Sequence, residues 1–458
     1  MIEFDFSNIL KENIGQQHGL VSDFYDKHNT IIREAYKKIE NSRGKSSYKF
    51  MELPYQKLDD IVEYKHKLEE FKYFVLIGIG GSSLGSYALF KALKHQNHNL
   101  INNKKIFFVD NSDPSTLNDI LDVIELENTV FNVVTKSGST AETMSSFSVI
   151  FDLLKEKELE VSKHIIATTT EKKGDLYSIA QKYELDTFFI PEDVGGRYSV
   201  LTPVGFIPAL YLDIDIKQLL EGAKVVDSAW RRKQVENNPI VLSGLINYLY
   251  DKKMTRNILA LMCYKDKLEN IGNWYQQLWA ESLGKKYDND NNIIENGSTP
   301  VILRGASDQH SVLQLFMEGP HDKLIVFLNS KKSLSDVEYN IDELSDYRSL
   351  SYFDGKSSEE LIQSELKGVQ YALQKVERPN YSITIDEIDE FHIGGLLYAL
   401  ELQTVLSASL YEVNPFDQPG VEEGKKATYA LMGRDGYDEK RKEMEENIKN
   451  KLTFEIKD

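Results

Sequence analysis

Short apolar runs recur along the first half of the chain at regular intervals. Each run is rich in β-branched and aromatic residues, and most are followed by a turn and by a stretch with a helical period. This alternation predicts a parallel sheet of β-α-β units with helices on both faces. The predicted strands are residues 72–79, 105–110, 129–135, 164–170 and 186–191, and the predicted helices include 84–93 and 115–124.

A second, looser series of the same kind follows. No Pro- or Ser-rich linker separates the two series, so we expect two α/β units with a wide interface. Residues 5–70 are polar and helix-like in period, and residues 330–360 are charged and Ser-rich, which predicts a surface excursion. The strands of the second series are residues 257–264, 300–305, 323–329 and 381–387, and its helices are 269–284, 310–318 and 392–413.

Composition limits the classes of function. A chain of 458 residues suits two domains, and a net charge of −18 argues against nucleic acid and anionic membranes as partners. The single cysteine, Cys263, excludes an internal disulfide and fits a reducing compartment. The N-terminus does not resemble a signal peptide, and the best apolar stretch, residues 200–212, is short and contains two prolines. We therefore expect a cytoplasmic protein.

The segment 129–143 carries the first candidate chemistry. A β-branched strand ends in a turn crowded with hydroxyl groups at an expected helix start, where free N–H groups and the helix dipole favour an anion. This pattern predicts a cup for a phosphate ester, and the alternative is an ordinary N-cap. The hydroxyl residues are Thr135, Ser137, Ser139, Thr140 and Thr143.

A weaker copy of this pattern, IGIGGSSLG, spans residues 77–85. It fits the dinucleotide fingerprint poorly, because Ser83 stands at the third glycine position and Asp110 follows too late. A phosphate or sugar turn with Ser82 as donor fits better, and a tight strand-to-helix turn is the alternative.

Two further segments offer charged groups for catalysis. In EDVGGRYSVLTPVG, residues 192–205, a Gly-Gly turn precedes Arg197, whose guanidinium can face an oxygen that gains negative charge. The alternative is an arginine that ties a domain junction to a carboxylate. In WAESLGKK, residues 279–286, Glu281 lies near bulky apolar groups, which favours a general base, although most helical glutamates are simply solvated.

His310 and a pair of lysines complete the candidates. His310 begins an amphipathic stretch and can transfer protons near neutral pH, although a lone His is more often only polar. Lys425 and Lys426 follow the turn FDQPG and can reach a sugar oxygen, or they lie on a solvated helix face. The remaining histidines form no convincing ligand set, so we expect no metal.

Taken together, these motifs resemble the glucose-6-phosphate isomerase, or phosphoglucose isomerase, family in its bacterial type. The resemblance covers residues 70–430 with the order of motifs intact. Its two specific stretches are residues 192–205 and SLYEVNPFDQPGVEEGK, residues 409–425. The chain departs from the family pattern at Ser83, where many members have Asp, and in the loop GASDQH before His310.

The resemblance implies an α/β fold of two SIS-type, flavodoxin-like domains with helical N- and C-terminal arms. The implied boundaries are an arm of residues 1–55 on the second domain, domains 56–215 and 216–413, and an arm 414–458. It also implies a homodimer that interconverts glucose 6-phosphate and fructose 6-phosphate without a cofactor. A related sugar isomerase, a non-catalytic sugar-phosphate sensor and an NAD-dependent dehydrogenase are the rival interpretations.

The resemblance also implies roles for individual residues. Glu281 matches the catalytic base, Arg197 the residue that steadies the enediolate, and Lys425 the ring-opening lysine. His310 matches a ring-opening His that the neighbouring subunit supplies. The residues implied to contact substrate are Gly81, Ser82, Thr135, Lys136, Ser137, Thr140, Glu142 and Gln418.

Overall fold

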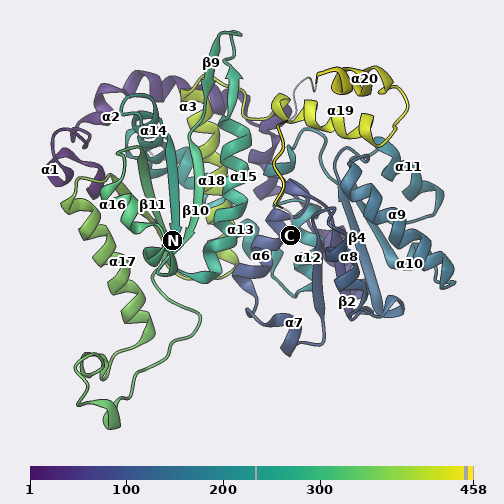
Figure 1. The fold of residues 1–458 in the computed structure, drawn as a ribbon, viewed down its shortest axis with the longest axis horizontal. Coiled ribbons are helices and arrows are strands. Elements are labelled where there is room, and N and C mark those ends of the chain that lie inside the picture. Colours follow the sequence, from purple (N-terminus) through teal and green to yellow (C-terminus); the bar gives the residue numbers. More distant parts are fainter. Residues whose placement is uncertain (233–234, 448–451, 457–458) are drawn as a thin grey trace.

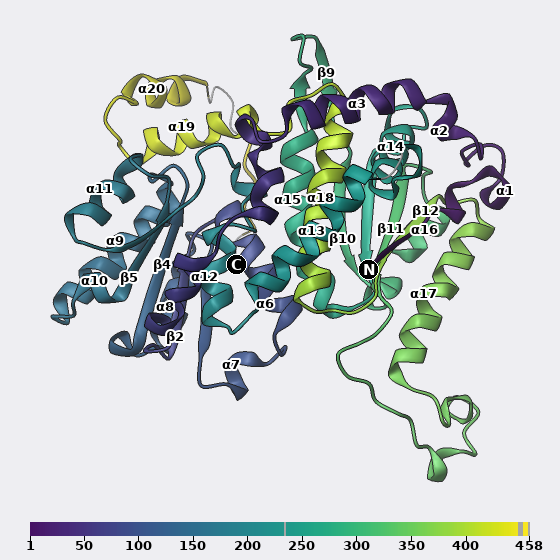
Figure 2. The ribbon, with the colours of Figure 1, turned by 180° about the vertical axis from the view of Figure 1, so that it is seen from behind.

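Two sheets, each with helices on both faces, lie side by side in the computed structural model, which describes residues 1–232, 235–447 and 452–456 (Figure 1). Their inner faces are turned toward each other across a shared layer of helices (Figure 2). The predicted fold class is therefore confirmed.

The first sheet is entirely parallel. Its strand order is β3-β2-β4-β5-β6, which is the flavodoxin order 2-1-3-4-5. In this order the direction in which successive strands are added to the sheet reverses between β2 and β4, and the loops after these two strands, residues 78–83 and 136–140, lie at the same edge of the sheet. All five strands were predicted to within two residues at each end: β2 Tyr73–Ile77, β3 Lys105–Val109, β4 Thr129–Thr135, β5 Ile165–Thr169 and β6 Asp186–Phe189.

The second sheet has the order β1-β12-β11-β7-β10, and only β1 runs antiparallel to its neighbour. The strands β7 Ile258–Cys263, β10 Thr299–Arg304, β11 Lys323–Ser330 and β12 Asn380–Ile385 match the predicted ones. The N-terminal arm was expected to be helical, but it begins with β1 Ile2–Asp5, whose Ile2 pairs with Ile385. A hairpin of β8 Lys285–Tyr287 and β9 Ile293–Asn296 was also not predicted.

Three apolar cores hold the layers together. The largest core fills the space between the two sheets, and smaller cores cover the outer face of each sheet. The central helices are α6 Leu84–Leu93, α12 Pro203–Tyr211, α13 Ile216–Arg232, α15 Glu269–Leu283 and α18 Glu390–Leu410. The outer helices include α9 Ala141–Glu156 and α11 Gly174–Lys182 on the first unit, and α16 Leu313–Glu318 and α17 Ser358–Lys375 on the second.

Helix α18 is the core helix of the molecule. It is longer than the apolar stretch 200–212, and by length and composition alone it could cross a membrane. However, 94% of the tested window is buried inside the protein, because α13, α14 Pro239–Lys252 and α15 pack around it. A helix that is apolar on all sides is expected at such a position.

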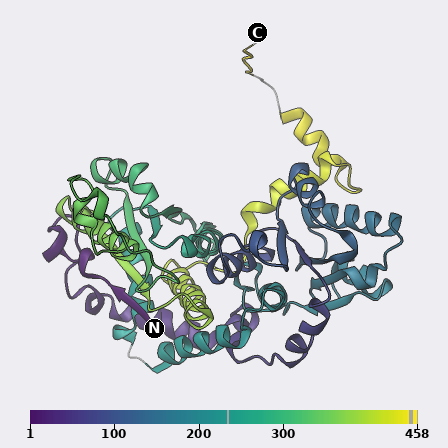
Figure 3. The ribbon, with the colours of Figure 1, turned by 90° about the horizontal axis from the view of Figure 1, so that it is seen from below.

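The peripheral segments do not belong to the two sheets or to the helix layers beside them. Helix α3 Asn29–Ser42 packs on α18, whereas α19 Glu422–Leu431 and α20 Asp438–Asn447 stand away from the body (Figure 3). Residues 331–357 are mostly exposed, as predicted for a surface excursion. Helix α16 is shorter than predicted, because residues 307–310 form a separate 3-10 turn.

Candidate active site

Arg197 is the centre of a polar cluster at the junction of the two units. It lies in the 3-10 turn Gly196–Tyr198 and is only 4% exposed. Its Nη1 donates to Glu281 Oε2 at 2.9 Å and to Gln418 Oε1 at 3.0 Å. Its Nε donates to Ser282 Oγ at 2.8 Å. The guanidinium fork therefore joins three segments that are far apart in the sequence, which fits both a catalytic arginine and the alternative of an arginine that ties a domain junction to a carboxylate.

Glu281 occupies the last turn of α15, and its side chain is 32% exposed. Both carboxylate oxygens are engaged, since Oε1 accepts a hydrogen bond of 2.9 Å from Gln277 Nε2 one turn earlier. The two opposed donors fix the orientation of the carboxylate. Gln277 and Ser282 were not predicted, although the spacing of four residues on one helix could have indicated Gln277.

The segment 415–418 is held against this carboxylate by backbone contacts. Arg197 Nη2 donates to the carbonyls of Pro415 and Asp417. The buried Lys285 donates to the carbonyls of Glu281, at 2.7 Å, and Asp417, at 2.6 Å. Desolvation lowers the pKa of the Lys285 ammonium. Lys285 thus positions the segment that carries Gln418, a role that sequence reasoning missed.

The glycine loop after β2 lies directly on the Gly-Gly turn. A Cβ atom on Gly81 would lie 2.3 Å from the carbonyl carbon of Gly196, so the contact between the two backbones requires glycine at position 81. Gly80 has a φ of +59°, and a Cβ there would lie 2.9 Å from Gln277 Nε2. This close packing brings the loop that carries the half-buried Ser82 to the edge of the Arg197 cluster.

Three hydroxyl groups converge in the loop after β4. Thr135 Oγ1 lies 2.9 Å from Thr140 Oγ1 and 3.3 Å from Ser137 Oγ, and the latter two are 3.2 Å apart. Thr140 is the N-cap residue of α9, yet its side chain makes no capping hydrogen bond. The hydroxyls therefore face one another beside the helix N-terminus, and Ser137 Oγ also accepts from the Ser139 N–H at 3.3 Å. The phosphate cup stays a prediction.

Lys136 lies in the same loop and is half-buried. Desolvation lowers the pKa of its ammonium, and the charges of Lys173 and Arg197 act in the same direction. Glu142 is half-buried in the first turn of α9, next to the cup.

Two predicted residues lie outside the cluster. Lys425 is exposed on α19, where its Nζ donates to Glu422 Oε1 at 2.8 Å. His310 is exposed at the end of the 3-10 turn Ser307–His310, and its side chain has no hydrogen bond within the described part of the chain. The adjacent Gln309 is instead tied to Tyr264 OH at 2.7 Å. One copy of the chain thus assembles Arg197, Glu281 and Gln418 but neither of these two residues.

The arrangement supplies an anion cup, a fixed carboxylate and a buried guanidinium at the junction of two α/β units. Residues 1–232, 235–447 and 452–456 contain no group of three or more His, Cys, Asp or Glu residues that could hold a metal ion. The fold and this cluster define a class of two-unit α/β proteins with a polar site at the junction of the units.

Comparison with known proteins identifies the family. The chain belongs to the phosphoglucose isomerase family, whose sequence profile matches residues 62–449. It is 38% identical over 453 residues to a glucose-6-phosphate isomerase of Carboxydothermus hydrogenoformans, with 97% of each chain covered. It is 43% identical over 370 residues to the enzyme of that name from Rubrobacter xylanophilus, with 80% of this chain and 83% of the relative covered.

Solved structures show the same architecture. A hypothetical protein from Thermus thermophilus superimposes with a TM-score of 0.85 at 31% identity, covering 94% of this chain and all of the other. A glucose-6-phosphate isomerase from Chlamydia trachomatis has a TM-score of 0.82 at 20% identity, over 96% of this chain and 93% of the other. The family resemblance drawn from the sequence motifs is therefore confirmed.

Proposed function

We propose that the protein is an aldose-ketose isomerase that interconverts glucose 6-phosphate and fructose 6-phosphate, a step of glycolysis and gluconeogenesis. The family supports this activity, as do the names of its curated relatives. The observation that carries the proposal is the Glu281 carboxylate, which is fixed between Arg197 and Gln277. The reaction moves a proton between adjacent carbons, so its chemistry requires no external oxidant or reductant.

Glu281 is the proposed general base. After ring opening, its carboxylate removes the proton from one carbon and returns it to the neighbouring carbon, through a cis-enediolate. The intermediate places negative charge on an oxygen atom. Arg197 is preorganised by its hydrogen bonds to Ser282 and to the segment 415–418, so it can stabilise that charge without reorientation. Gln418, which accepts from the same guanidinium, contacts the sugar.

The phosphate group of the substrate binds in the cup formed by the two loops at the edge of the first sheet. Its ligands are the hydroxyls of Ser82, Thr135, Ser137 and Thr140 and the ammonium of Lys136, while Gly81 and Glu142 border the cup. These groups take no part in proton transfer. They fix the position of the sugar carbons relative to Glu281, which can lower the barrier by several kcal/mol.

His310 and Lys425 are the proposed ring-opening pair. Lys425 follows Gln418 by seven residues, so closure of α19 over the bound sugar would bring its ammonium to the ring. The ion pair between Lys425 and Glu422 is exposed and therefore weak, so it opposes this movement little. His310 is exposed in its own chain, which supports a homodimer in which each copy completes the site of the other.

A mixing experiment tests the shared site. Glu281→Gln and His310→Gln homodimers are each expected to be inactive, and subunit exchange should restore activity, because a heterodimer contains one intact site. Exchange is verified by native mass spectrometry with differently tagged chains. The absence of rescue in a verified heterodimer contradicts the shared site.

We further propose that residues 56–215 and 216–413 are the two domains, that residues 1–55 and 414–458 are arms, and that the enzyme works in the cytoplasm. The arm of residues 1–55 contacts the second unit through β1 and α3. The net charge of −18 and the buried single cysteine fit this location.

Isotope exchange tests the reaction directly. Incubation with fructose 6-phosphate in deuterated water should place deuterium at C2 of the glucose 6-phosphate product. A sugar-phosphate sensor would bind without exchange, and a dehydrogenase would require NAD. Mannose 6-phosphate in a parallel assay measures how strictly the site selects the configuration at C2. Substrate binding without any exchange would contradict the proposed function.

A further inference from the structure

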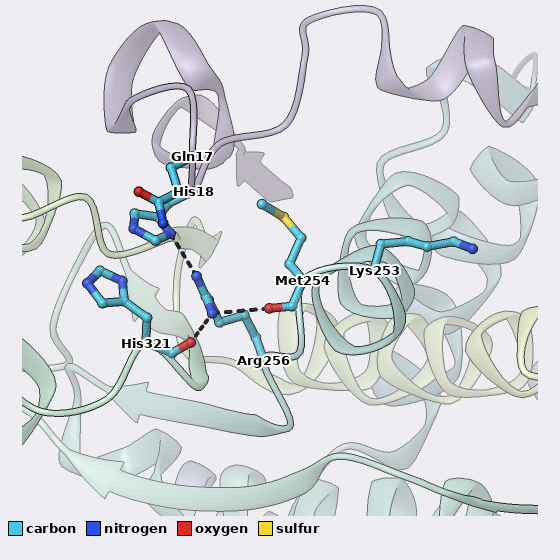
Figure 4. Close-up of a pocket in the computed structure, with 6 residues that line it drawn as sticks. All are labelled: Gln17, His18, Lys253, Met254, Arg256 and His321. Atoms are coloured by element: carbon cyan, nitrogen blue, oxygen red, sulfur yellow. Dashed lines mark hydrogen bonds between the residues drawn. The ribbon is translucent and has the colours of Figure 1, made fainter.

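A basic cavity of about 540 Å³ lies at the N-terminal side of the second sheet. One wall is the loop of Gln17 and His18, and the opposite walls are the segment 253–256 before β7 and His321 before β11 (Figure 4). The cavity shares no residue with the candidate active site.

The lining is basic although the chain is strongly acidic. None of the six lining residues carries a carboxylate, in a protein with a net charge of −18. The rings of His18 and His321 stack with centroids 4.1 Å apart and planes 13° from parallel. Lys253 lies at the rim and is exposed, whereas Arg256 is only 8% exposed. A buried guanidinium next to two imidazoles normally requires an anion.

The hydrogen bonds of Arg256 leave part of its donor capacity unused. Its Nη2 donates to His18 Nδ1 at 2.8 Å, and its Nη1 donates to the carbonyls of Met254, at 3.1 Å, and His321 (Figure 4). All of these acceptors are neutral. Its Nε is buried without a partner in the described part of the chain, and so is Nδ1 of His321. Unpartnered buried polar atoms are costly. Both atoms are closed to solvent, so an anion in the cavity removes that cost only if the two side chains turn toward it.

The surrounding carboxylates offset the positive charge of the cavity only in part. The buried Arg378 lies nearby, and its hydrogen bonds within the described residues go to backbone carbonyls. Glu377 is 3.9 Å from His18 Nε2, and Asp322 is paired with Lys323. Desolvation lowers the pKa of His321 to about 4, and nearby positive charge acts in the same direction. Desolvation also lowers the pKa values of Arg256 and Arg378.

We propose that this cavity is a binding site for a phosphate group, either as free phosphate or as part of a small phosphorylated metabolite. A tetrahedral dianion accepts hydrogen bonds from several directions, so it can engage Arg256, His321 and the Gln17 amide together. The Lys253 side chain points away from the two imidazoles in Figure 4, so its ammonium joins these groups only after a change of rotamer. The volume exceeds that of a bare phosphate ion and leaves room for a small organic part. The bound anion links the loop of residues 17–18 to the segments that enter β7 and β11.

Equilibrium dialysis with radiolabelled inorganic phosphate tests the proposal on the full chain. All variants are made in a chain that already carries Ser137→Ala and Thr140→Ala, because these two changes remove phosphate ligands of the active-site cup. One phosphate per chain should still bind. Lys253→Gln should weaken binding about fivefold, as for one lost charge contact, and Arg256→Gln should abolish it. Arg232→Gln, at an exposed position, is the matched control.

Competition identifies the source of the phosphate group. Two competitors, glycerol 3-phosphate and unlabelled phosphate, are compared by the concentration that displaces the label. If glycerol 3-phosphate acts at the lower concentration, the natural ligand is a phosphorylated metabolite. If unlabelled phosphate acts at the lower concentration, the natural ligand is the free ion. Either order supports the site. If no phosphate binds to the background variant, or if Lys253→Gln and Arg232→Gln bind it equally, the proposal is wrong. Lys253 is exposed, so this comparison does not depend on the folding of the Arg256 variant.

Histidine signals in NMR provide a second readout. Bound phosphate should raise the pKa values of His18 and His321, because it offsets the positive charge of Arg256 and Arg378. The other charged groups that face these rings, Glu377 and Asp322, are present in both states. Unchanged titration curves at saturating phosphate would overturn the assignment to this cavity.

Discussion

Replacement of Glu281 by glutamine preserves the shape of the side chain but removes its charge and its ability to accept a proton. In the wild type two donors point at the carboxylate, Arg197 Nη1 and Gln277 Nε2, each at 2.9 Å. A glutamine at position 281 has only one acceptor oxygen. The Gln277 amide can rotate, because its own Oε1 is buried without a partner in the described structure, and that oxygen can then accept from the new amide. The variant should therefore fold.

The expected effects on stability and on rate are of different size. Exchange of one charge-assisted hydrogen bond for a neutral one costs about 1–2 kcal/mol of unfolding free energy. Loss of a general base lowers kcat about 10³- to 10⁴-fold, or about 4–5.5 kcal/mol in the activation free energy. Substrate affinity should change little, because the phosphate cup is unaltered.

The assay combines a coupled measurement of kcat, calorimetric titration with fructose 6-phosphate, and deuterium exchange at C2. Glu412→Gln, which removes an exposed carboxylate near the end of α18, is the control for the change in net charge. A folded Glu281→Gln protein that binds substrate and retains more than about a tenth of the wild-type kcat would refute the role of Glu281 as the base.

Three further predictions concern other parts of the molecule. The double variant Ser137→Ala/Thr140→Ala should raise KM at least about tenfold with a smaller change in kcat, because the two hydroxyls bind phosphate and leave proton transfer alone; an unchanged KM would locate the cup elsewhere. The pKa of His321 is about 4 in the folded state against 6.5 ordinarily, so the unfolded state binds the extra proton between these values and the free energy of unfolding should fall as the pH drops from about 6.5 to about 4. His321→Gln should flatten this decline in urea titrations at several pH values, and an identical slope in both proteins would contradict it. Cys263 is buried and burial raises its pKa, so it should react with a thiol reagent only on unfolding; rapid reaction of the native protein would contradict this burial.

The sequence was sufficient to predict the strands of the two parallel series, because each is a continuous apolar run between turn residues. It was insufficient for β1 and for the hairpin β8–β9. Residues 2–5 are too few to show a clear period, and their partner, β12, lies at the other end of the chain. The start of α16 was predicted at residue 310, but the helix begins at Leu313. Periodicity does not distinguish a 3-10 turn from the helix that follows it.

The candidate site was only partly predictable from the sequence. The hydroxyl loop was evident from composition, because the relevant residues lie within a few positions of each other. The contact of Arg197 with Glu281 was not, since these residues are 84 positions apart and no local pattern encodes their approach. The family resemblance implied a role for each residue but did not predict their contact. Lys285 was missed because a lysine beyond a helix end usually lies in solvent, whereas here two backbone carbonyls and the Asp417 carboxylate surround its ammonium.

The antiparallel pairing of β1 with β12 sets an order of events during synthesis of the chain. Residues 2–5 leave the ribosome long before residues 382–385, with which they pair. The second sheet cannot close until most of the protein has been made. Without β1, β12 would be an edge strand with unpaired N–H and C=O groups, and such edges recruit strands from other molecules. Residues 2–5 therefore cover an edge of β12 that would otherwise be open to pairing with another chain.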